Sequence, residues 1–237
     1  MISLNAGASG SSARPSRSTA LRSRWVLLTG SAVMMSLFVL VSFQVRAGGW
    51  VTSADQPVLD WFVAHRWAPL NFLAQLVSLV ADPVGSAVLA AAAAVFLYLR
   101  TKDRVVAAYI LGAAALGGVA ILVAKHLVDR QRPPLATQLV LETNGSFPSG
   151  HLTSAVLVYG SIALALIVTS GARPVRTAVV AVVAMVLVGV DRLYLGVHWF
   201  SDLVGATTLG LSLFLLGAAV WLELRRSGFD LRRPAVS

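Results

Sequence analysis

Three short segments of this chain hold side chains whose types suit chemistry on a phosphate group. They are Lys125–Pro133, Pro148–His151 and Asp191–Asp202, and they contribute lysine, arginine, histidine, serine and aspartate. A phosphoryl group in transfer spreads negative charge over its oxygens, and fixed cations stabilise that charge. The residue types therefore predict a site for phosphoryl transfer, provided that the fold brings the three segments together.

The predicted phosphate-binding groups are three cations and the start of one helix. Lys125, Arg132 and Arg192 come from two of the segments, and a guanidinium fork can bind two phosphate oxygens at once. Ser149 and Gly150 stand where an apolar stretch begins. A helix that starts there offers a hydroxyl and free backbone N–H groups, and its dipole favours an anion.

Two histidines supply groups that could accept the phosphoryl group and move a proton. His198 and Asp202 are four residues apart, so on a helix they share a face, and the carboxylate can accept a hydrogen bond from one ring nitrogen. That bond fixes the tautomer and leaves the other nitrogen free to attack phosphorus. His151 is then available to protonate the leaving oxygen and afterwards to activate water.

In these motifs the chain resembles the type 2 phosphatidic acid phosphatase (PAP2) family, which is related to the vanadium haloperoxidases. The family pattern is K-x6-RP, then PSGH, then SR-x5-H-x3-D, and the chain has the three motifs in this order with the same internal spacing. Asp191 occupies the position of the usual serine. An acid beside Arg192 either weakens its hold on phosphate or helps to position it. The resemblance covers roughly residues 55–222.

The resemblance implies a role for each matching residue. His198 would be the nucleophile, Asp202 its orienting partner and His151 the acid and base. Phosphate would be bound by Lys125, Arg132, Ser149, Gly150 and Arg192. The family's chemistry implies neither a metal ion nor a cofactor.

The rest of the sequence indicates which elements must position these residues. Of the 237 residues, 57% are hydrophobic and 12% are charged, whereas a soluble domain carries about 25% charged residues. Six apolar stretches lie near the roughly 20 residues with which a helix crosses hydrocarbon. They are 25–45, 83–99, 105–124, 152–170, 175–190 and 203–222. We therefore expect an all-α integral membrane protein, a six-transmembrane-helix bundle with a PAP2-type core.

Lysine and arginine divide unevenly between the two sides of these spans. Thirteen of the 19 lie on the side that holds both termini, and the positive-inside rule places that side in the cytoplasm. We therefore expect a multi-pass protein of the cell membrane, with both termini cytoplasmic and the active site extracytoplasmic. The net charge of +9 then reflects topology and anionic lipid headgroups, not a nucleic-acid partner.

The polar ends and two apolar segments complete the predicted organisation. Residues 1–24 are expected to form a disordered basic cytoplasmic tail, 25–224 the six-helix phosphatase domain, and 225–237 a second basic cytoplasmic tail. Segment 68–81 is expected to be an interfacial helix, or else an extension of the second span. The first span could also be a cleaved signal peptide, although its apolar run is long for one.

One arginine and three glycines have interpretations of their own. Arg130 either supports the phosphate site from behind or is a solvated charge. Gly112, Gly117 and Gly118 are expected where helices pack closely. Cysteine is absent, which excludes a disulfide framework and a thiolate metal site.

Together these features predict a metal-independent lipid phosphatase that acts through a phosphohistidine. The substrate would be a phosphomonoester or diphosphate of a lipid, of the undecaprenyl diphosphate or phosphatidic acid type. The partners would be this lipid and the bilayer. Two alternatives remain open at this stage: a phosphotransferase with the same intermediate, and a non-enzymatic membrane transporter or scaffold in which the motifs are idle.

Overall fold

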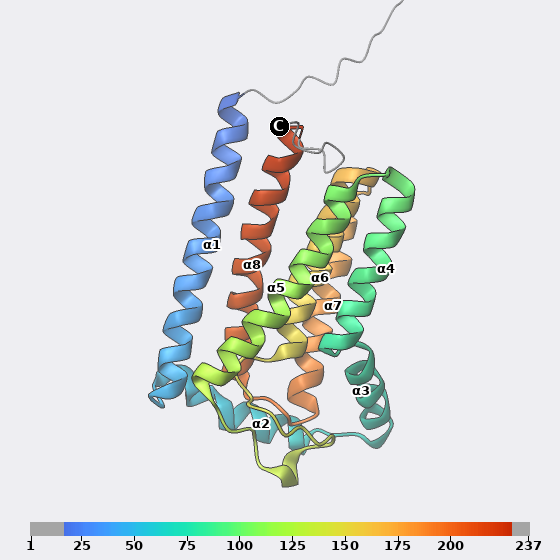
Figure 1. Cartoon of the computed structure of the whole chain (residues 1–237). Coiled ribbons are helices and arrows are strands. Elements are labelled where there is room, and N and C mark those ends of the chain that lie inside the picture. Colours follow the sequence, from blue (N-terminus) through green and yellow to red (C-terminus); the bar gives the residue numbers. More distant parts are fainter. Residues whose placement is uncertain (1–16, 229–237) are drawn as a thin grey trace, which may run out of the picture.

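The described part of the chain, residues 17–228, folds into helices joined by loops in this computed structural model (Figure 1). The α-helices are α1 (Arg17–Arg46), α2 (Asp55–Ala64), α3 (Ala68–Val80), α4 (Pro83–Thr101), α5 (Arg104–Val128), α6 (Gly150–Ser170), α7 (Pro174–Tyr194) and α8 (Phe200–Arg226). Two 3-10 helices, η1 (Trp50–Ala54) and η2 (Leu135–Thr137), lie in the connections. Six of these helices, α1 and α4 to α8, are long and apolar enough to cross a membrane. The expected all-α bundle with six spans is confirmed.

The first and last helices of the described chain, α1 and α8, are longer than expected. α1 begins at Arg17, so the prediction of disorder is wrong for residues 17–24. The physical reason is that no proline or glycine follows Pro15 until the span has begun, and nothing therefore interrupts the helix. At the same end, Arg226 of α8 donates to Ser23 Oγ at 2.9 Å. Residues 1–16 and 229–237, which make up the rest of the two tails, lie outside the described residues.

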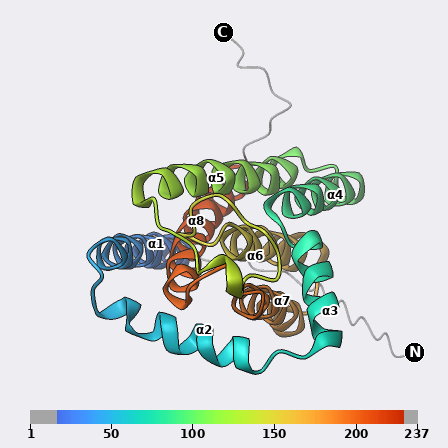
Figure 2. The ribbon, with the colours of Figure 1, turned by 90° about the horizontal axis from the view of Figure 1, so that it is seen from below.

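α6 forms the centre of the bundle (Figure 2). It packs against α4, α5, α7 and α8, and 12 of its 21 residues are buried. The surrounding helices instead expose large apolar side chains, such as Leu122 on α5 and Val180 on α7. The helix whose start carries the PSGH motif is therefore fixed from several sides, and the outer helices present an apolar surface to lipid.

The three glycines that were expected at helix contacts behave differently. A Cβ on Gly117 of α5 would lie 2.8 Å from Leu157 Cδ2 on α6, so the two helices meet closely here and a larger residue would require the leucine side chain to move. A Cβ on Gly112 or Gly118 would have nothing within 4 Å, so the prediction is wrong for these two. Both face hollows between helices, and Gly118 lines the pocket described below.

Helices α2 and α3 lie at one end of the bundle, and the N-terminal end of α1 and the C-terminal end of α8 lie at the other (Figures 1 and 2). α3 ends at Val80, and α4 begins at Pro83, where the Asp82 side chain accepts a hydrogen bond from Gly85 N. Segment 68–81 is therefore a separate helix and does not extend the second span. Its interfacial location remains a prediction, which agrees with the exposure of Trp61 and Trp67 beside it.

Candidate active site

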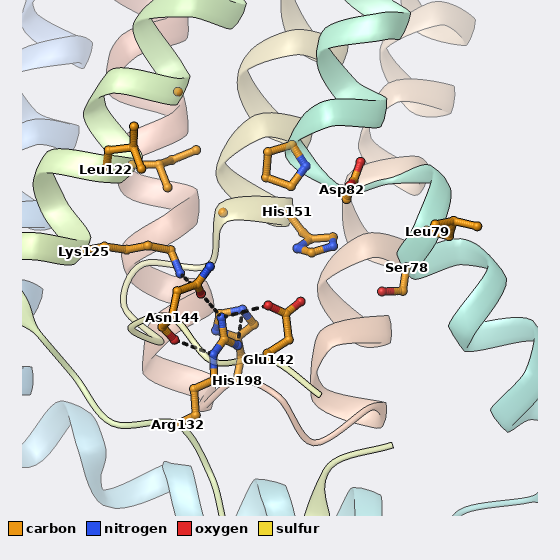
Figure 3. A pocket seen from close by; sticks show the side chains of 14 residues that line it. Ser78, Leu79, Asp82, Leu122, Lys125, Arg132, Glu142, Asn144, His151 and His198 are labelled. Atoms are coloured by element: carbon orange, nitrogen blue, oxygen red, sulfur yellow. Dashed lines mark hydrogen bonds and ion pairs between the residues drawn. The ribbon is translucent and has the colours of Figure 1, made fainter. Parts of the chain in front are cut away.

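A pocket of about 480 Å³ opens near the end of the bundle that carries α2 and α3 (Figure 3). Its apolar lining comes from α3, α4 and α5 and includes Leu79, Pro83, Ile121 and Leu122. Its polar lining includes Lys125, Arg132, Glu142, Asn144, His151 and His198. Leu79 and Leu122 are 72% and 69% exposed, so the pocket opens onto the apolar outer surface of the bundle.

The predicted nucleophile and its partner are hydrogen-bonded at this pocket. His198 Nδ1 lies 3.2 Å from Asp202 Oδ2, and both side chains are buried. The expectation that one helix face carries both residues is wrong, because α8 begins only at Phe200. The pair forms because Asp202 lies in the first turn of α8 and its Oδ2 also accepts from Trp199 N at 2.9 Å. His198 approaches this helix start from the preceding loop.

The loop that carries His198 is held by two tight contacts. Gly196 has a φ of 69°, and a Cβ there would lie 2.2 Å from the carbonyl oxygen of Thr137. Arg66 donates from Nη2 to the same carbonyl at 2.6 Å and from Nε to Tyr194 O at 3.1 Å. The glycine turn and the arginine therefore fix the direction from which His198 enters the pocket.

Burial determines the protonation state of His198. It lowers the pKa of His198 from 6.5 to about 4, against the opposing effect of the hydrogen bond and charge of Asp202. The charges of Arg132 and Lys125 lower this pKa further. The ring is therefore neutral near pH 7, with its proton on Nδ1 toward Asp202 and a lone pair on Nε2.

Arg132 is bound by protein acceptors through all three of its nitrogens. Nε donates to Asn144 O at 2.8 Å, and Nη2 donates to Asn144 Oδ1 at 2.6 Å. Nη1 donates to Val197 O at 2.6 Å and lies 3.2 Å from His198 Nε2. Glu142 Oε2 is 3.4 Å from Nη2. The guanidinium is thus held beside the predicted nucleophile, next to a carboxylate that neutralises part of its charge.

Two polar residues of the pocket, Glu142 and Asn144, were missed by the sequence analysis. Lys125 Nζ donates to Asn144 Oδ1 at 2.9 Å and also to Gly145 O. Glu142 and Asn144 reach the site through the irregular loop between α5 and α6, where no helical or strand spacing relates them to the motifs. Their position shortly before the PSGH motif was the available signal.

Arg192 lies behind the pocket. It is fully buried, and its Nε, at 3.1 Å, and its Nη2 both donate to Asp191 Oδ2. Its Nη1 lies 3.0 Å from His151 Nε2 and 4.0 Å from Glu142 Oε1. Asp191, at the position of the family's serine, therefore engages two of the three guanidinium nitrogens. A neutral His151 that accepts from Arg192 at Nε2 carries its proton on Nδ1.

Ser149 and Gly150, the other two predicted phosphate-binding residues, stand at the start of α6. Gly150 lines the pocket, and a Cβ there would lie 3.5 Å from Pro83 Cγ and 3.6 Å from Ile121 Cγ2. The Ser149 hydroxyl is buried and has no hydrogen-bond partner among residues 17–228. Ser149 N donates to Asp202 O at 3.4 Å, which joins the start of α6 to the start of α8.

Arg130 is not a solvated charge, because its side chain is only 15% exposed. Its Nη1 donates to Asp202 Oδ1 at 2.6 Å, and its guanidinium lies over the Trp199 ring at 5.6 Å from the ring centre. It therefore supports the site from behind, through the residue that orients His198.

The structure thus brings the residues of all three motifs to one place. Those that line the pocket are Lys125, Arg132, Gly150, His151 and His198. Those buried directly behind it are Ser149, Arg192 and Asp202. A neutral imidazole that is oriented by a carboxylate and flanked by cations can attack an electrophile that carries negative charge. The individual catalytic roles stay predictions.

Comparison with known proteins agrees with this arrangement. The sequence model described as the PAP2 superfamily matches residues 105–226, which include all three motifs. Phosphatidylglycerophosphatase B of Bacillus subtilis (strain 168) is 37% identical over 129 residues, which are 52% of this chain and 61% of that protein. The match thus spans less than two thirds of this relative. The crystal structure described as the first transmembrane PAP2 type phosphatidylglycerolphosphate phosphatase from Bacillus subtilis matches with a TM-score of 0.75 and 26% identity, over 86% of this chain and 98% of that chain.

Proposed function

Because this chain belongs to the PAP2 superfamily, we propose that it is a membrane phosphatase that removes phosphate from a phosphomonoester or diphosphate of a lipid without a metal ion. Its first candidate substrate is phosphatidylglycerol phosphate, after the names of both Bacillus subtilis relatives. Phosphatidic acid and undecaprenyl diphosphate are the other lipids to test, because each presents a terminal phosphate on an apolar chain.

One observation carries the proposal: His198, held by Asp202, faces a pocket with a charged side and an apolar side. A lipid phosphate has the same division, since its headgroup is anionic and its chains are apolar. Lys125 and Arg132 lie on the charged side, whereas Leu79 and Leu122 lie on the side exposed to lipid. A soluble phosphate ester would leave that apolar lining unused.

In the first step, Nε2 of His198 forms a bond to phosphorus, and the bond from phosphorus to the lipid oxygen breaks with its electron pair. His151, which enters this step protonated on both ring nitrogens, gives one proton to that oxygen and becomes neutral, so the lipid leaves as an alcohol. Asp202 stabilises the imidazole ring, which becomes more positive as it binds phosphorus. Lys125 and Arg132 offset the negative charge that spreads over the phosphoryl oxygens.

In the second step, water attacks the phosphorus of the phosphohistidine while His151 accepts a proton from that water. The nitrogen–phosphorus bond breaks, and its electron pair returns to Nε2 of His198. Inorganic phosphate then leaves, and both histidines are restored. Each step needs only a lipid phosphate, water and the side chains of the pocket.

The proposed location is the cell membrane with the pocket on the outer face. The excess of lysine and arginine on the side of the termini supports this orientation. In the structure, the residues that line the pocket lie at the end of the bundle opposite to the N-terminal end of α1 and the C-terminal end of α8.

The test is phosphate release by the purified protein in detergent, from the three lipids presented separately. We expect wild-type protein to release phosphate from phosphatidylglycerol phosphate, and folded His198→Ala protein to release none. Release of equal phosphate by both proteins would refute the role of the site. Labelled phosphate that appears on a second lipid instead of in water would identify a phosphotransferase.

A further inference from the structure

Asp55, the first residue of α2, is a buried carboxylate that lies outside the three motifs. It is 5% exposed, although α2 lies across the end of the bundle and exposes much of its length (Figure 2). A buried carboxylate is costly unless it is paired with a cation and hydrogen-bonded. The partners of Asp55 therefore explain why it is tolerated there.

Both oxygens of Asp55 bind groups next to the predicted nucleophile. Oδ1 accepts from Ser201 N at 2.8 Å, and Oδ2 accepts from Ser201 Oγ at 2.8 Å. Oδ2 also accepts from Arg130 Nη2 at 2.6 Å. Ser201 belongs to the first turn of α8, which also holds Asp202. Trp199, the residue before α8, provides no side-chain cap. Asp55 therefore accepts, from another helix, one of the backbone N–H groups that have no partner within α8.

Arg130 connects Asp55 to the catalytic pair. Its two terminal nitrogens are divided between two carboxylates, with Nη2 on Asp55 and Nη1 on Asp202 Oδ1, each at 2.6 Å. Asp202 Oδ2 in turn faces His198 Nδ1 at 3.2 Å. A continuous path of charged hydrogen bonds thus runs from α2 to the imidazole.

We infer that Asp55 is a positioning residue for the nucleophile, which acts through Arg130 on Asp202 and so on His198. This inference rests on the proposed function. Phosphorylation makes the imidazole more positive, and Asp202 must offset that charge. An Arg130 bound to Asp202 alone would draw away part of the carboxylate's charge, whereas Asp55 shares the cation. Asp55 thereby leaves Asp202 able to stabilise the phosphorylated ring.

The central experiment compares Asp55→Asn with wild type and with Asp60→Asn. Asparagine keeps an oxygen for Ser201 N and removes the charge that Arg130 faces. Asp60 lies on the same helix, and within the described part of the chain its exposed side chain bonds to Gln56 alone, at 2.8 Å. It is therefore a matched control. With phosphatidylglycerol phosphate in detergent micelles, we expect kcat of Asp55→Asn to fall about 10- to 100-fold, the loss seen when the hydrogen-bond partners that orient metal-bound histidines are removed.

A positioning role should lower kcat and leave substrate binding unchanged. Asp55 does not line the pocket, so KM and inhibition by inorganic phosphate should stay at wild-type values in Asp55→Asn. A kcat that also stays at the wild-type value would overturn the inference. So would a fall in activity that only follows the loss of folded protein, measured by thermal unfolding.

A double-variant cycle tests whether Asp55 acts through Arg130. We expect Asp55→Asn/Arg130→Met to turn over at the rate of Arg130→Met alone, because the path is already broken. If the losses of kcat in Asp55→Asn and Arg130→Met instead multiply in the double variant, Asp55 does not act through Arg130. The double variant also removes the guanidinium that Asp55→Asn deprives of one of its two carboxylates, so it serves if Asp55→Asn does not fold.

A spectroscopic readout separates this inference from the proposed function. In ¹⁵N-histidine-labelled protein, the Nδ1–H signal of His198, identified by its absence in His198→Ala, should shift in Asp55→Asn and not in Asp60→Asn. Absence of wild-type turnover would refute the proposed lipid activity, yet this signal would still show whether Asp55 acts on His198 through Arg130 and Asp202. An unchanged signal in Asp55→Asn would overturn the inference that Asp55 positions His198.

Discussion

Arg132 Nη1 lies 3.2 Å from His198 Nε2, so the cation predicted to bind phosphate touches the atom predicted to attack it. The Nδ1 proton of His198 faces Asp202, and the arginine therefore donates to the lone pair of Nε2. In the proposed mechanism, an incoming phosphate oxygen would take over this N–H and so free the lone pair. Substrate binding would then also release the proposed nucleophile.

The two histidines should be separable by the quality of the leaving group. His198→Ala should form no phosphoenzyme with any substrate. His151→Ala should lose about 10²- to 10⁴-fold in turnover of a lipid phosphate, because an alkoxide needs a proton to leave. With p-nitrophenyl phosphate, whose leaving group needs none, we expect a rapid burst of nitrophenolate from His151→Ala and then slow hydrolysis.

The burst assay has an internal control, since acid-labile ³²P on the protein should rise with the burst. A burst in His198→Ala, or labelled phosphate on that variant, would contradict the assignment of the nucleophile. An unchanged steady rate in His151→Ala would contradict its role toward water.

Asp191→Ser should bind phosphate analogues more tightly and be less stable without them. Asp191 engages two nitrogens of Arg192, and its removal leaves a buried cation that phosphate can compensate. We expect the vanadate inhibition constant to fall, and the rise in Tm on adding vanadate to exceed that of wild type. Weaker vanadate binding in folded Asp191→Ser would show that Asp191 positions Arg192 instead.

Glu142→Gln should lower the inhibition constant of inorganic phosphate. Glu142 lies 3.4 Å from Arg132 Nη2 and 4.0 Å from Arg192 Nη1, so its carboxylate competes with phosphate for the same cations. Glutamine keeps the shape and removes the charge. Glu223→Gln is the matched control and should leave phosphate inhibition unchanged, because Glu223 lies at the far end of α8, where its carboxylate is 3.9 Å from Arg226 Nη1. Weaker phosphate inhibition in Glu142→Gln would refute the competition.

His198 should titrate with a midpoint near pH 4, because burial lowers its pKa to about 4. The folded state then binds fewer protons than the unfolded state between this pKa and the ordinary 6.5. The stability that the neutral ring contributes is complete above pH 6.5 and is lost as the pH falls toward 4. Histidine ¹⁵N shifts followed against pH measure the midpoint directly, whereas rate profiles also contain the phosphate ionisation near pH 6. A midpoint near 6.5 would contradict the burial effect.

Activity should survive EDTA, because the proposed charge stabilisation comes from Lys125, Arg132 and Arg192. Vanadate should inhibit, since it imitates the five-coordinate phosphorus of the transition state. The measurement is phosphate release from micelles after extensive treatment with chelator. Loss of activity that added Mg²⁺ restores would refute a metal-independent site.

Sequence reasoning reached the spans and the motif residues because both depend on local patterns. Runs of about 20 apolar residues indicate spanning helices, and motif spacing identified His198 with Asp202 and Lys125 with Arg132. The helical explanation for the histidine and aspartate failed, because the helix starts between them. A separation of four residues fits a helix-capping geometry as well as a helix face.

The remaining site residues depend on contacts that local spacing does not encode. Asp55 meets Arg130 across 75 positions of sequence, and Glu142 reaches the cations from an irregular loop. Arg192 donates to Asp191 in a fully buried position, and this depends on side-chain geometry. All three contacts depend on how whole helices pack, which the spacing of residues in the sequence does not predict.

The exposed leucines at the pocket have a kinetic consequence. Leu79 and Leu122 belong to the surface that the bundle presents to lipid, so a substrate can arrive by lateral diffusion with its chains still in the bilayer. Encounters then occur in two dimensions, and their rate depends on the mole fraction of lipid phosphate in the surface. Dilution of the substrate with inert detergent should slow the enzyme even when its bulk concentration is constant.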